Sequence, residues 1–296
     1  MSTISRRKVL RSAMAGAAFA AVPLSGQTPA QPDVQPDVQP AQRKGRIRQS
    51  VCRWCYAKTS LDDLCVFGVK IGLKGIDLLQ PAEFEIPGRY GLVSSMGYAE
   101  AGTIKDGLNR LENHASIEAG LRKNIAAAVK AGVPNLITFS GNRRGMSNDE
   151  GLKNTVIGLN RVKKIVEDNG IILCMELLNS KVNHPDYMCD STAWGVKVAQ
   201  EVNSPNVKLL YDIYHMQIME GDLIRTIQTN IQWLGHFHTG GVPGRHELND
   251  QQEVQWDGVM RGIAATPFKG FVAHEFVPIA PEPLASLRQA VNLCDV

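Results

Sequence analysis

Short apolar runs alternate with longer stretches of helical periodicity from Arg46 to the end of the chain, and the alternation recurs about eight times. The apolar runs predict strands at 49–54, 75–79, 91–97, 135–140, 171–177, 207–212, 234–239 and 270–276. Apolar positions three and four residues apart predict helices at 114–131, 150–168, 192–202, 223–230, 256–265 and 283–293. Helix-start signals, Ser147-Asn148-Asp149 and Asp190-Ser191, precede two of these helices.

Strand–helix units with nearly continuous apolar strands indicate parallel strands that are covered by helices. Such units close either as a doubly wound open sheet or as an eight-stranded barrel. The first predicted strand is not followed by a G-x-G-x-x-G loop, and no gap between units is long enough for a domain break. Polar residues also gather after the strands, as they do in barrels. The sequence therefore predicts a single (β/α)8 TIM barrel domain over residues 46–296.

The first 30 residues have the composition of an export signal. Arg6 and Arg7 lie in a basic stretch that precedes an apolar run, rich in Ala and Gly, from 13 to 24. That run is too short to predict a stable membrane span in the mature form. Residues 31–45 form a Pro-rich linker that cannot bury apolar area. We expect a twin-arginine signal peptide over 1–30 and export to the periplasm or another extracytoplasmic space.

Composition and charge narrow the function classes. Of the 296 residues, 44% are hydrophobic and 21% are charged, which is typical of a globular protein with a sizeable core. The net charge of +3 is mild, and part of the basic excess lies in the N-terminal segment, so nucleic-acid binding is not indicated. A small anionic substrate fits this charge. A homo-oligomer is also compatible with this composition and charge.

Six cysteines raise the question of disulfides or a metal site. Cys52 and Cys55 form a C-x-x-C, but Cys52 falls within a predicted strand and the sequence has no second C-x-x-C. We interpret the cysteines as buried or partly buried free thiols. A structural zinc site and a redox pair are the alternatives.

Four consecutive predicted strands each end in a side chain that can bind a divalent cation, namely Glu176, Asp212, His238 and Glu275. A carboxylate at such a position is costly unless it is paired or coordinated. Because barrel active sites form at the C-terminal ends of the strands, we expect the four side chains to meet. Three oxygen donors and one imidazole suit Mn²⁺, Mg²⁺ or Co²⁺, with Zn²⁺ and iron as alternatives.

Two histidines alternate in G-H-F-H-T and therefore point to the same face of their strand. If this face is the barrel interior, His238 lies nearer the C-terminal end and is the metal ligand. His236 then lies one layer below, as a hydrogen-bonded core residue or as a group that supports the ligand.

Several motifs around these residues carry a resemblance to a known family: M-E-L-L-N (175–179), Y-D-I-Y-H-M-Q (211–217), G-H-F-H with V-P-G-R-H-E (235–247) and A-H-E-F (273–276). In combination they resemble the hydroxypyruvate isomerase family within the xylose isomerase-like barrel superfamily, over essentially the whole chain after the linker. The resemblance implies one divalent metal held by Glu176, Asp212, His238 and Glu275. It also implies that Glu176 and Glu275 exchange the substrate proton.

Two positions depart from the family pattern. His238 stands where hydroxypyruvate isomerases often carry Gln and where the related ketose 3-epimerases carry His. Val182 stands where the 3-epimerases carry a glutamate, six residues beyond their first metal-binding glutamate. The resemblance therefore implies the class of reaction more firmly than the substrate.

Further residues are candidates for holding the substrate. His215 is expected at the start of the loop after the sixth strand, where it can contact a substrate oxygen. The planar fork of Arg245 matches a carboxylate. Arg143, after the fourth strand, can add to an anionic pocket, and His114 is expected to approach the site. Trp54, at the end of the first strand, can form a wall of the pocket.

The predicted function is a metal-dependent isomerase that interconverts hydroxypyruvate, tartronate semialdehyde or a similar small hydroxy-carbonyl compound. Its two glutamates would move a proton through an enediolate. The alternative within enzymes is a sugar epimerase or ketose isomerase with the same metal site. A hydrolase of the endonuclease IV type would need more histidines and a basic groove. A non-catalytic exported sugar-binding barrel is a different class, and it predicts that the four side chains do not meet.

Overall fold

The computed structural model describes residues 43–296. Its strands are β1 (Arg48–Cys52), β2 (Gly75–Asp77), β3 (Val93–Ser94), β4 (Asn135–Thr138), β5 (Ile172–Glu176), β6 (Val207–Asp212), β7 (Leu234–Thr239) and β8 (Phe271–His274). Its α-helices are α1 (Leu61–Lys70), α2 (His114–Lys130), α3 (Asn148–Asp168), α4 (Thr192–Val202), α5 (Ile213–Met219), α6 (Leu223–Asn230), α7 (Trp256–Ala264) and α8 (Pro283–Leu293). Short 3-10 turns are η1 (Arg53–Tyr56), η2 (Pro81–Glu83), η3 (Pro87–Tyr90), η4 (Leu111–Asn113) and η5 (Ile231–Trp233).

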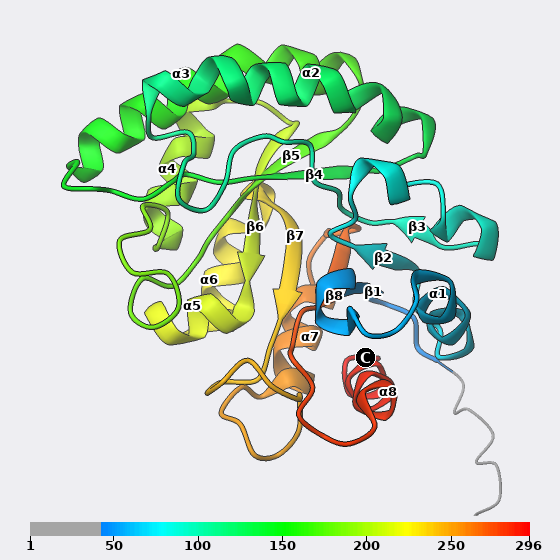
Figure 1. The fold of residues 1–296 in the computed structure, drawn as a ribbon. Helices are drawn as coiled ribbons and strands as arrows, with labels where there is room; N and C mark the ends of the chain where they lie inside the picture. Colours follow the sequence, from blue (N-terminus) through cyan, green and yellow to red (C-terminus); the bar gives the residue numbers. More distant parts are fainter. Residues whose placement is uncertain (1–42) are drawn as a thin grey trace, which may run out of the picture. The chain divides into compact units, whose positions relative to one another are not determined.

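All paired strands are parallel, in the order β3-β2-β1-β8-β7-β6-β5-β4. Gly97 joins the two ends of this sheet, because it bridges both Leu79, beyond β2, and Leu136 in β4. A side chain at Gly97 would lie 2.3 Å from the ring of Phe84, so the close approach needs glycine. The strands curl with the helices outside them (Figure 1). The predicted (β/α)8 TIM barrel is confirmed.

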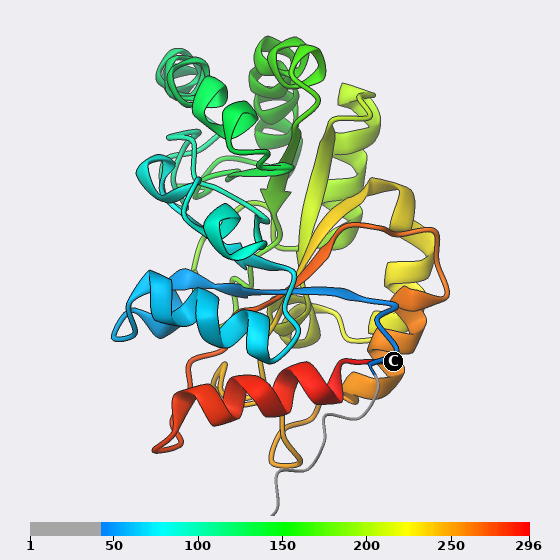
Figure 2. The same ribbon diagram turned by 90° about the vertical axis from the view of Figure 1, so that its right-hand side faces the viewer.

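The helices begin where the capping residues predict. Ser147 accepts a hydrogen bond from the backbone N–H of Glu150 at the start of α3, and Ser191 accepts one from Trp194 at the start of α4. Apolar faces of these helices pack against the outside of the barrel. Figure 2 shows α8 running alongside β1, where the Gln49 side chain donates to the carbonyl of Val291.

Two helices were not among those predicted. Helix α1 begins with a Ser60 cap and two acidic residues in its first turn, a signal that the sequence does contain. Helix α5 has only seven residues and follows β6 without a loop, so it is too short to display a clear period. The strands β2 and β3 are shorter than predicted, at three and two residues.

The barrel interior combines an apolar core with a polar layer. Strand residues such as Val51, Ile76 and Leu173 are fully buried. Near the C-terminal ends of the strands the buried residues become polar, and His236 and His238 are both inaccessible to solvent. The polar end of the barrel is therefore built from the strands themselves, which fixes its side chains more rigidly than loops would.

The N-terminal segment is largely outside the described residues. The predicted signal over 1–30 and most of the predicted linker over 31–45 lie in the part that the structure does not describe. Within residues 43–296, no helix combines the length and apolar character needed to cross a membrane.

Candidate metal centre and active site

Four side chains from neighbouring strands converge at the C-terminal mouth of the barrel. Glu176 and Asp212 are the last residues of β5 and β6, His238 lies near the end of β7, and Glu275 follows β8 directly. Each offers one ligand atom, and these atoms all lie within 4.8 Å of one another. All four side chains are buried. The arrangement has the donors, the spacing and the seclusion that a divalent cation requires.

The buried carboxylates have perturbed pKa values. Burial raises the pKa of Glu176, and it raises the pKa of Asp212 to about 7 although nearby Arg245 opposes the shift. Burial also tends to raise the pKa of Glu275, but Arg245 and His238 outweigh it and lower the pKa well below the usual range. Burying three carboxylates together is unfavourable without positive charge between them.

The ring of His238 presents one nitrogen to this cluster. Its Nδ1 lies 2.7 Å from Glu275 Oε2 and 3.4 Å from Glu176 Oε1. Nδ1 is buried and has no aligned hydrogen-bond partner among the described residues. Burial lowers the pKa of His238, but Glu275, Cys52 and Asp77 outweigh burial and raise it well above the usual range. Nδ1 is therefore a site where a proton and a cation compete, which fits a metal ligand.

Asp77 is a buried carboxylate that the sequence reasoning missed. It is the last residue of β2, and its Oδ2 lies 3.0 Å from the other ring nitrogen, Nε2, of His238. The predicted strand ran from 75 to 79, which placed Asp77 in its middle, whereas β2 ends at Asp77. A carboxylate inside an otherwise apolar stretch was the signal that could have revealed it.

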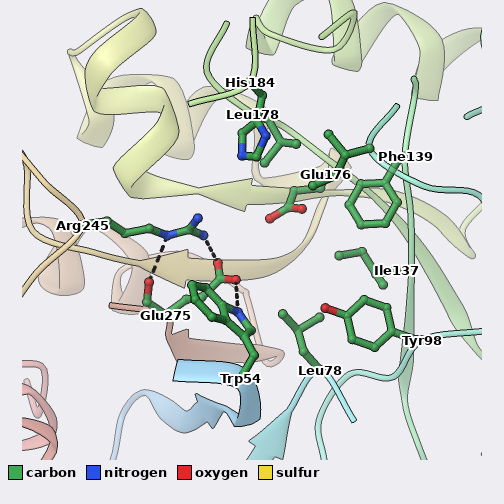
Figure 3. A pocket seen from close by; sticks show the side chains of 11 residues that line it. Trp54, Leu78, Tyr98, Ile137, Phe139, Glu176, Leu178, His184, Arg245 and Glu275 are labelled. Carbon is green, nitrogen blue, oxygen red and sulfur yellow. Dashed lines mark hydrogen bonds and ion pairs between the residues drawn. The ribbon is translucent and has the colours of Figure 1, made fainter. Parts of the chain in front are cut away.

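A cavity of about 280 Å³ opens above the cluster (Figure 3). The charged and polar side chains that line it are Glu176, His184, Arg245 and Glu275. The aliphatic and phenylalanine side chains of its lining are Leu78, Ile104, Ile137, Phe139 and Leu178. Leu78 has a φ of 53°, unusual for leucine, and this turn directly after β2 brings its side chain into the wall. The structure places Trp54 in the wall as well, where its Nε1 donates to Glu275 Oε1 at 2.7 Å.

Arg245 reaches the cluster from the loop after β7. Its guanidinium makes an ion pair with Glu275 and lies 3.2 Å from Asp212 Oδ2. The group is 5.4 Å from the ring centres of both Trp54 and Tyr214, which confine it. The structure thus brings Arg245 to the pocket, in contact with two of the candidate metal ligands.

His215 lies in helix α5, not in the loop that the sequence suggested. The Asn179 amide Nδ2 lies 2.6 Å from His215 Nδ1, and Asn179 Oδ1 accepts the backbone N–H groups of Val182 and Asn183. The amide orientation therefore makes Nδ1 an acceptor and leaves the proton on Nε2. Burial, with Arg245, lowers the pKa of His215 well below its usual range. Its Nε2 is buried without a partner among the described residues, 3.6 Å from Asp212, and His215 is not among the residues that line the cavity described above.

The structure does not bring Arg143 and His114 to the cavity. The Arg143 guanidinium donates to the carbonyl oxygens of Tyr187 and Met188 and pairs with Asp190 at 2.8 Å, so it fastens the loop after β5. His114 begins α2, where it is buried with Nε2 2.7 Å from the carbonyl oxygen of Leu108. Both side chains have polar partners in the protein and are absent from the described cavity lining.

None of the six cysteines, all within the described residues, forms a disulfide. Five are buried and Cys55 is half-buried. Burial raises the pKa of Cys52 and Cys55 well above the usual thiol range. This agrees with the interpretation as free, largely buried thiols and gives no support for a reactive pair.

The family model for the xylose isomerase-like TIM barrel matches residues 105–293, nearly two thirds of the chain. The matched span includes the strands that carry Glu176, Asp212, His238 and Glu275. The chain belongs to the xylose isomerase-like TIM barrel family.

Comparison with individual proteins gives partial matches. The chain is 28% identical over 123 residues to a Danio rerio protein provisionally named hydroxypyruvate isomerase, a match covering 42% of this chain and 45% of that one. It is 39% identical over 97 residues to the D-psicose 3-epimerase of Agrobacterium fabrum, which covers 31% and 32% of the two chains. The chain thus spans less than half the length of each of these curated relatives.

Among solved structures, an AP endonuclease of family 2 from Brucella melitensis is similar, with a TM-score of 0.71 and 21% identity. The match covers 81% of this chain and 96% of that one. At this identity the likeness concerns the fold alone.

Proposed function

We propose that this protein is a divalent-metal-dependent isomerase of a small hydroxy-carbonyl compound of the hydroxypyruvate or tartronate semialdehyde class. The observation that carries the proposal is the convergence of Glu176, Asp212, His238 and Glu275 beneath a cavity. The partial matches to a protein named for hydroxypyruvate isomerisation and to a ketose epimerase support the same type of chemistry.

The four converging residues would hold the cation. Three carboxylates and one imidazole favour Mn²⁺ or Mg²⁺, and Co²⁺, Zn²⁺ and iron are compatible with the set. When bound, the cation supplies positive charge that stabilises the oxygens of an enediolate. Oxygen and nitrogen ligands that already lie within 4.8 Å of one another need little rearrangement to bind it.

Glu176 and Glu275 would move the proton. They line the cavity from β5 and β8 and lie on different sides of it (Figure 3). A carboxylate on each side of the substrate can take a proton from one carbon and deliver a proton to the next. We infer that Glu176 and Glu275 share these two steps, and the direction of transfer between them is left open.

His215 and Arg245 would orient the substrate. The unpartnered Nε2–H of His215 is a neutral donor that can bind a carbonyl or hydroxyl oxygen. Arg245 lines the cavity and can bind a substrate carboxylate through its planar fork. Because Arg245 also contacts Glu275, it links substrate binding to a group that moves the proton.

A sugar 3-epimerase is the second candidate. The cavity of about 280 Å³ is larger than a three-carbon acid requires, and one partial relative is named as a D-psicose 3-epimerase. Against it, the position where such enzymes carry their additional glutamate is Val182, whose side chain is 64% exposed. A non-catalytic barrel is disfavoured because it predicts that the four ligands do not meet.

The test is a substrate screen in D₂O with Mn²⁺ and with Mg²⁺, using hydroxypyruvate, four-carbon oxo acids and ketohexoses. The proposal predicts deuterium uptake accompanied by aldehyde–ketone interconversion of a small hydroxy-carbonyl acid. An epimerised ketohexose as the only product would favour the second candidate. Absence of exchange with every compound, in protein that binds metal, would contradict both enzyme functions.

We also propose that the chain is exported, on the basis of Arg6, Arg7 and the apolar run after them. Fusion of residues 1–30 to a reporter that is active only outside the cytoplasm tests this. Export is expected to be lost in the Arg6→Lys/Arg7→Lys variant. Reporter activity that persists in the variant, or is absent with the natural segment, would contradict twin-arginine export.

A further inference from the structure

Asp77 lies outside the cluster of four ligands, at the bottom of the site. It is fully buried, and a hydroxyl, a thiol and two imidazole rings surround its carboxylate. Ser95 Oγ donates to Oδ1 at 2.5 Å, and the Cys52 thiol donates to Oδ2 at 3.6 Å. His236 Nε2 lies 3.1 Å from Oδ1, although poorly aligned, and His238 Nε2 lies 3.0 Å from Oδ2. Because the hydroxyl and the thiol both donate to it, the carboxylate acts as an ionised acceptor.

Asn135 determines which nitrogen of His236 carries the proton. Its Nδ2 donates to the carbonyl oxygen of Ser95 at 3.1 Å, which fixes the orientation of the amide. The same Nδ2 lies 3.2 Å from His236 Nδ1, so Nδ1 must act as an acceptor. The proton of the neutral ring is then on Nε2, the nitrogen that faces Asp77.

The same reasoning applies to His238. Because Asp77 can only accept, His238 Nε2 carries a proton and donates it to Oδ2. The lone pair of the neutral ring is then on Nδ1, 2.7 Å from Glu275 and 3.4 Å from Glu176. Rings that bind metals generally donate their other N–H in this way.

We propose that Asp77 is a positioning residue, which fixes His238 with its Nδ1 lone pair toward the metal centre, and that Asn135 and His236 support Asp77 in this role. The inference rests on the proposed metal site. It assigns a function to a carboxylate that contributes no ligand to the set of four, and it explains why two histidines alternate on β7.

The key variant is Asp77→Asn. The Asn side chain has nearly the same shape as Asp, but its N–H₂ group is a donor and would face neighbours that also donate. Either His236 or His238 must then present an unprotonated Nε2. We expect the Kd for Mn²⁺, measured by calorimetry on the full chain, to rise about 10- to 100-fold. Adding His236→Gln supplies an amide oxygen that can accept the new N–H. The Kd of the double variant for Mn²⁺ is expected to be at least about threefold lower than that of Asp77→Asn alone.

Thr239→Val is the matched control. Thr239 Oγ1 hydrogen bonds to the buried ring of His274 at 3.2 Å, one residue along β7 from His238 but on the other face of the strand. The control therefore removes a buried hydrogen bond to a histidine without touching the site. Its Kd for Mn²⁺ is expected to stay within about threefold of the wild type if the site is undisturbed.

The outcomes separate the inference from the proposed function. If the wild type binds no Mn²⁺, the metal site and the inference are both wrong. If the wild type binds Mn²⁺ and folded Asp77→Asn binds it equally well, or Thr239→Val weakens binding as much, only the inference is wrong. Failure of His236→Gln to recover affinity also contradicts it, since the conflict between donors would then not be the cause.

A measurement on the wild type remains decisive if Asp77→Asn does not fold. In ¹⁵N-histidine-labelled protein loaded with Zn²⁺, the NMR spectrum should show a proton on His238 Nε2, protected from exchange, and metal at Nδ1. Metal at Nε2, or an Nε2 without a proton, would overturn the proposal.

Discussion

The two halves of the barrel differ in what they contribute to the cavity. Strands β5 to β8 end in the four candidate ligands, and the loop after β7 adds Arg245. Strand β4 and the residues directly after β2 and β4 contribute an apolar wall that includes Leu78, Ile137 and Phe139. Apart from Asp77, which lies below the cavity, the chemistry is concentrated in one half. The difference teaches that the candidate metal ligands and the polar substrate contacts lie in one half and the apolar wall in the other, so substitutions in the wall should change substrate fit without changing cation binding.

The largest effect is expected for Glu275→Gln in the acidic half. Losing both a group that moves the substrate proton and one metal ligand should reduce kcat at least about 10³-fold, since proton transfer alone contributes 10²–10⁴-fold. Circular dichroism should show an intact fold. Glu282→Gln, at an exposed position seven residues on, is the control and should retain full turnover. Turnover of Glu275→Gln within about tenfold of the wild type would remove Glu275 from the mechanism.

His215→Asn is expected to have the next largest effect. The shorter side chain loses the Nε2–H donor, so kcat/KM should fall about 10- to 100-fold, the value of one hydrogen bond to a charged oxygen. His215 is not one of the four ligands, and the Kd for Mn²⁺ should change less than about threefold. An equal loss in metal affinity would show that His215 maintains the cluster and does not contact the substrate.

A pH experiment separates the mouth of the barrel from the opposite face of β7 and β8, where His274 lies beside Thr239. Burial lowers the pKa of His274 to about 3, below its unfolded value of about 6.5, so the unfolded chain binds the proton first and stability is lost as pH falls from 6.5 toward 3. The contribution of Asp212 to the pH dependence of stability has the opposite sign. Its pKa of about 7 exceeds the unfolded value, so its protonation favours the folded state as pH falls.

In EDTA, lowering the pH from 6.5 to 4.5 should therefore reduce the free energy of unfolding of the wild type by about 2 kcal/mol more than that of His274→Gln. Urea unfolding at the two pH values measures this difference. Identical losses in the two proteins would mean that His274 is protonated in the fold.

The smallest effect is expected in the apolar half. Ile137→Ala removes part of the wall and should raise KM about fivefold to tenfold, because two or three buried methyl and methylene groups of contact are lost. Titration with Mn²⁺ should give an unchanged Kd. A change in metal affinity here would mean that the two halves are not separable.

The sequence predicted the strands of the acidic half better than those of the apolar half. β6 and β7 were predicted to the residue, and each has six residues and ends in a polar side chain. β3 has only two residues, and Gly97, which closes the barrel, lies outside it, so periodicity could not locate the closure. Strand ends reveal ligands only where the strands are long enough to be recognised.

Residues beyond the strand ends were predicted less well than residues in strands. Arg143 and His114 were chosen from their positions after strands, but a side chain beyond a strand can turn toward the protein instead of the cavity. Both found backbone carbonyl partners, which a sequence does not reveal. His215 was identified by its spacing from Asp212, and its orientation depends on Asn179, 36 positions earlier in the chain.

The most direct test of the metal centre is equilibrium dialysis of the purified, EDTA-treated chain against Mn²⁺. Asp212 belongs to the cluster but not to the proposed proton transfer, so Asp212→Asn tests metal binding without removing a group that moves the proton. The account predicts about one Mn²⁺ per wild-type chain and at least about 100-fold weaker binding by Asp212→Asn. Equal binding by the two proteins, or no binding by the wild type, would contradict it.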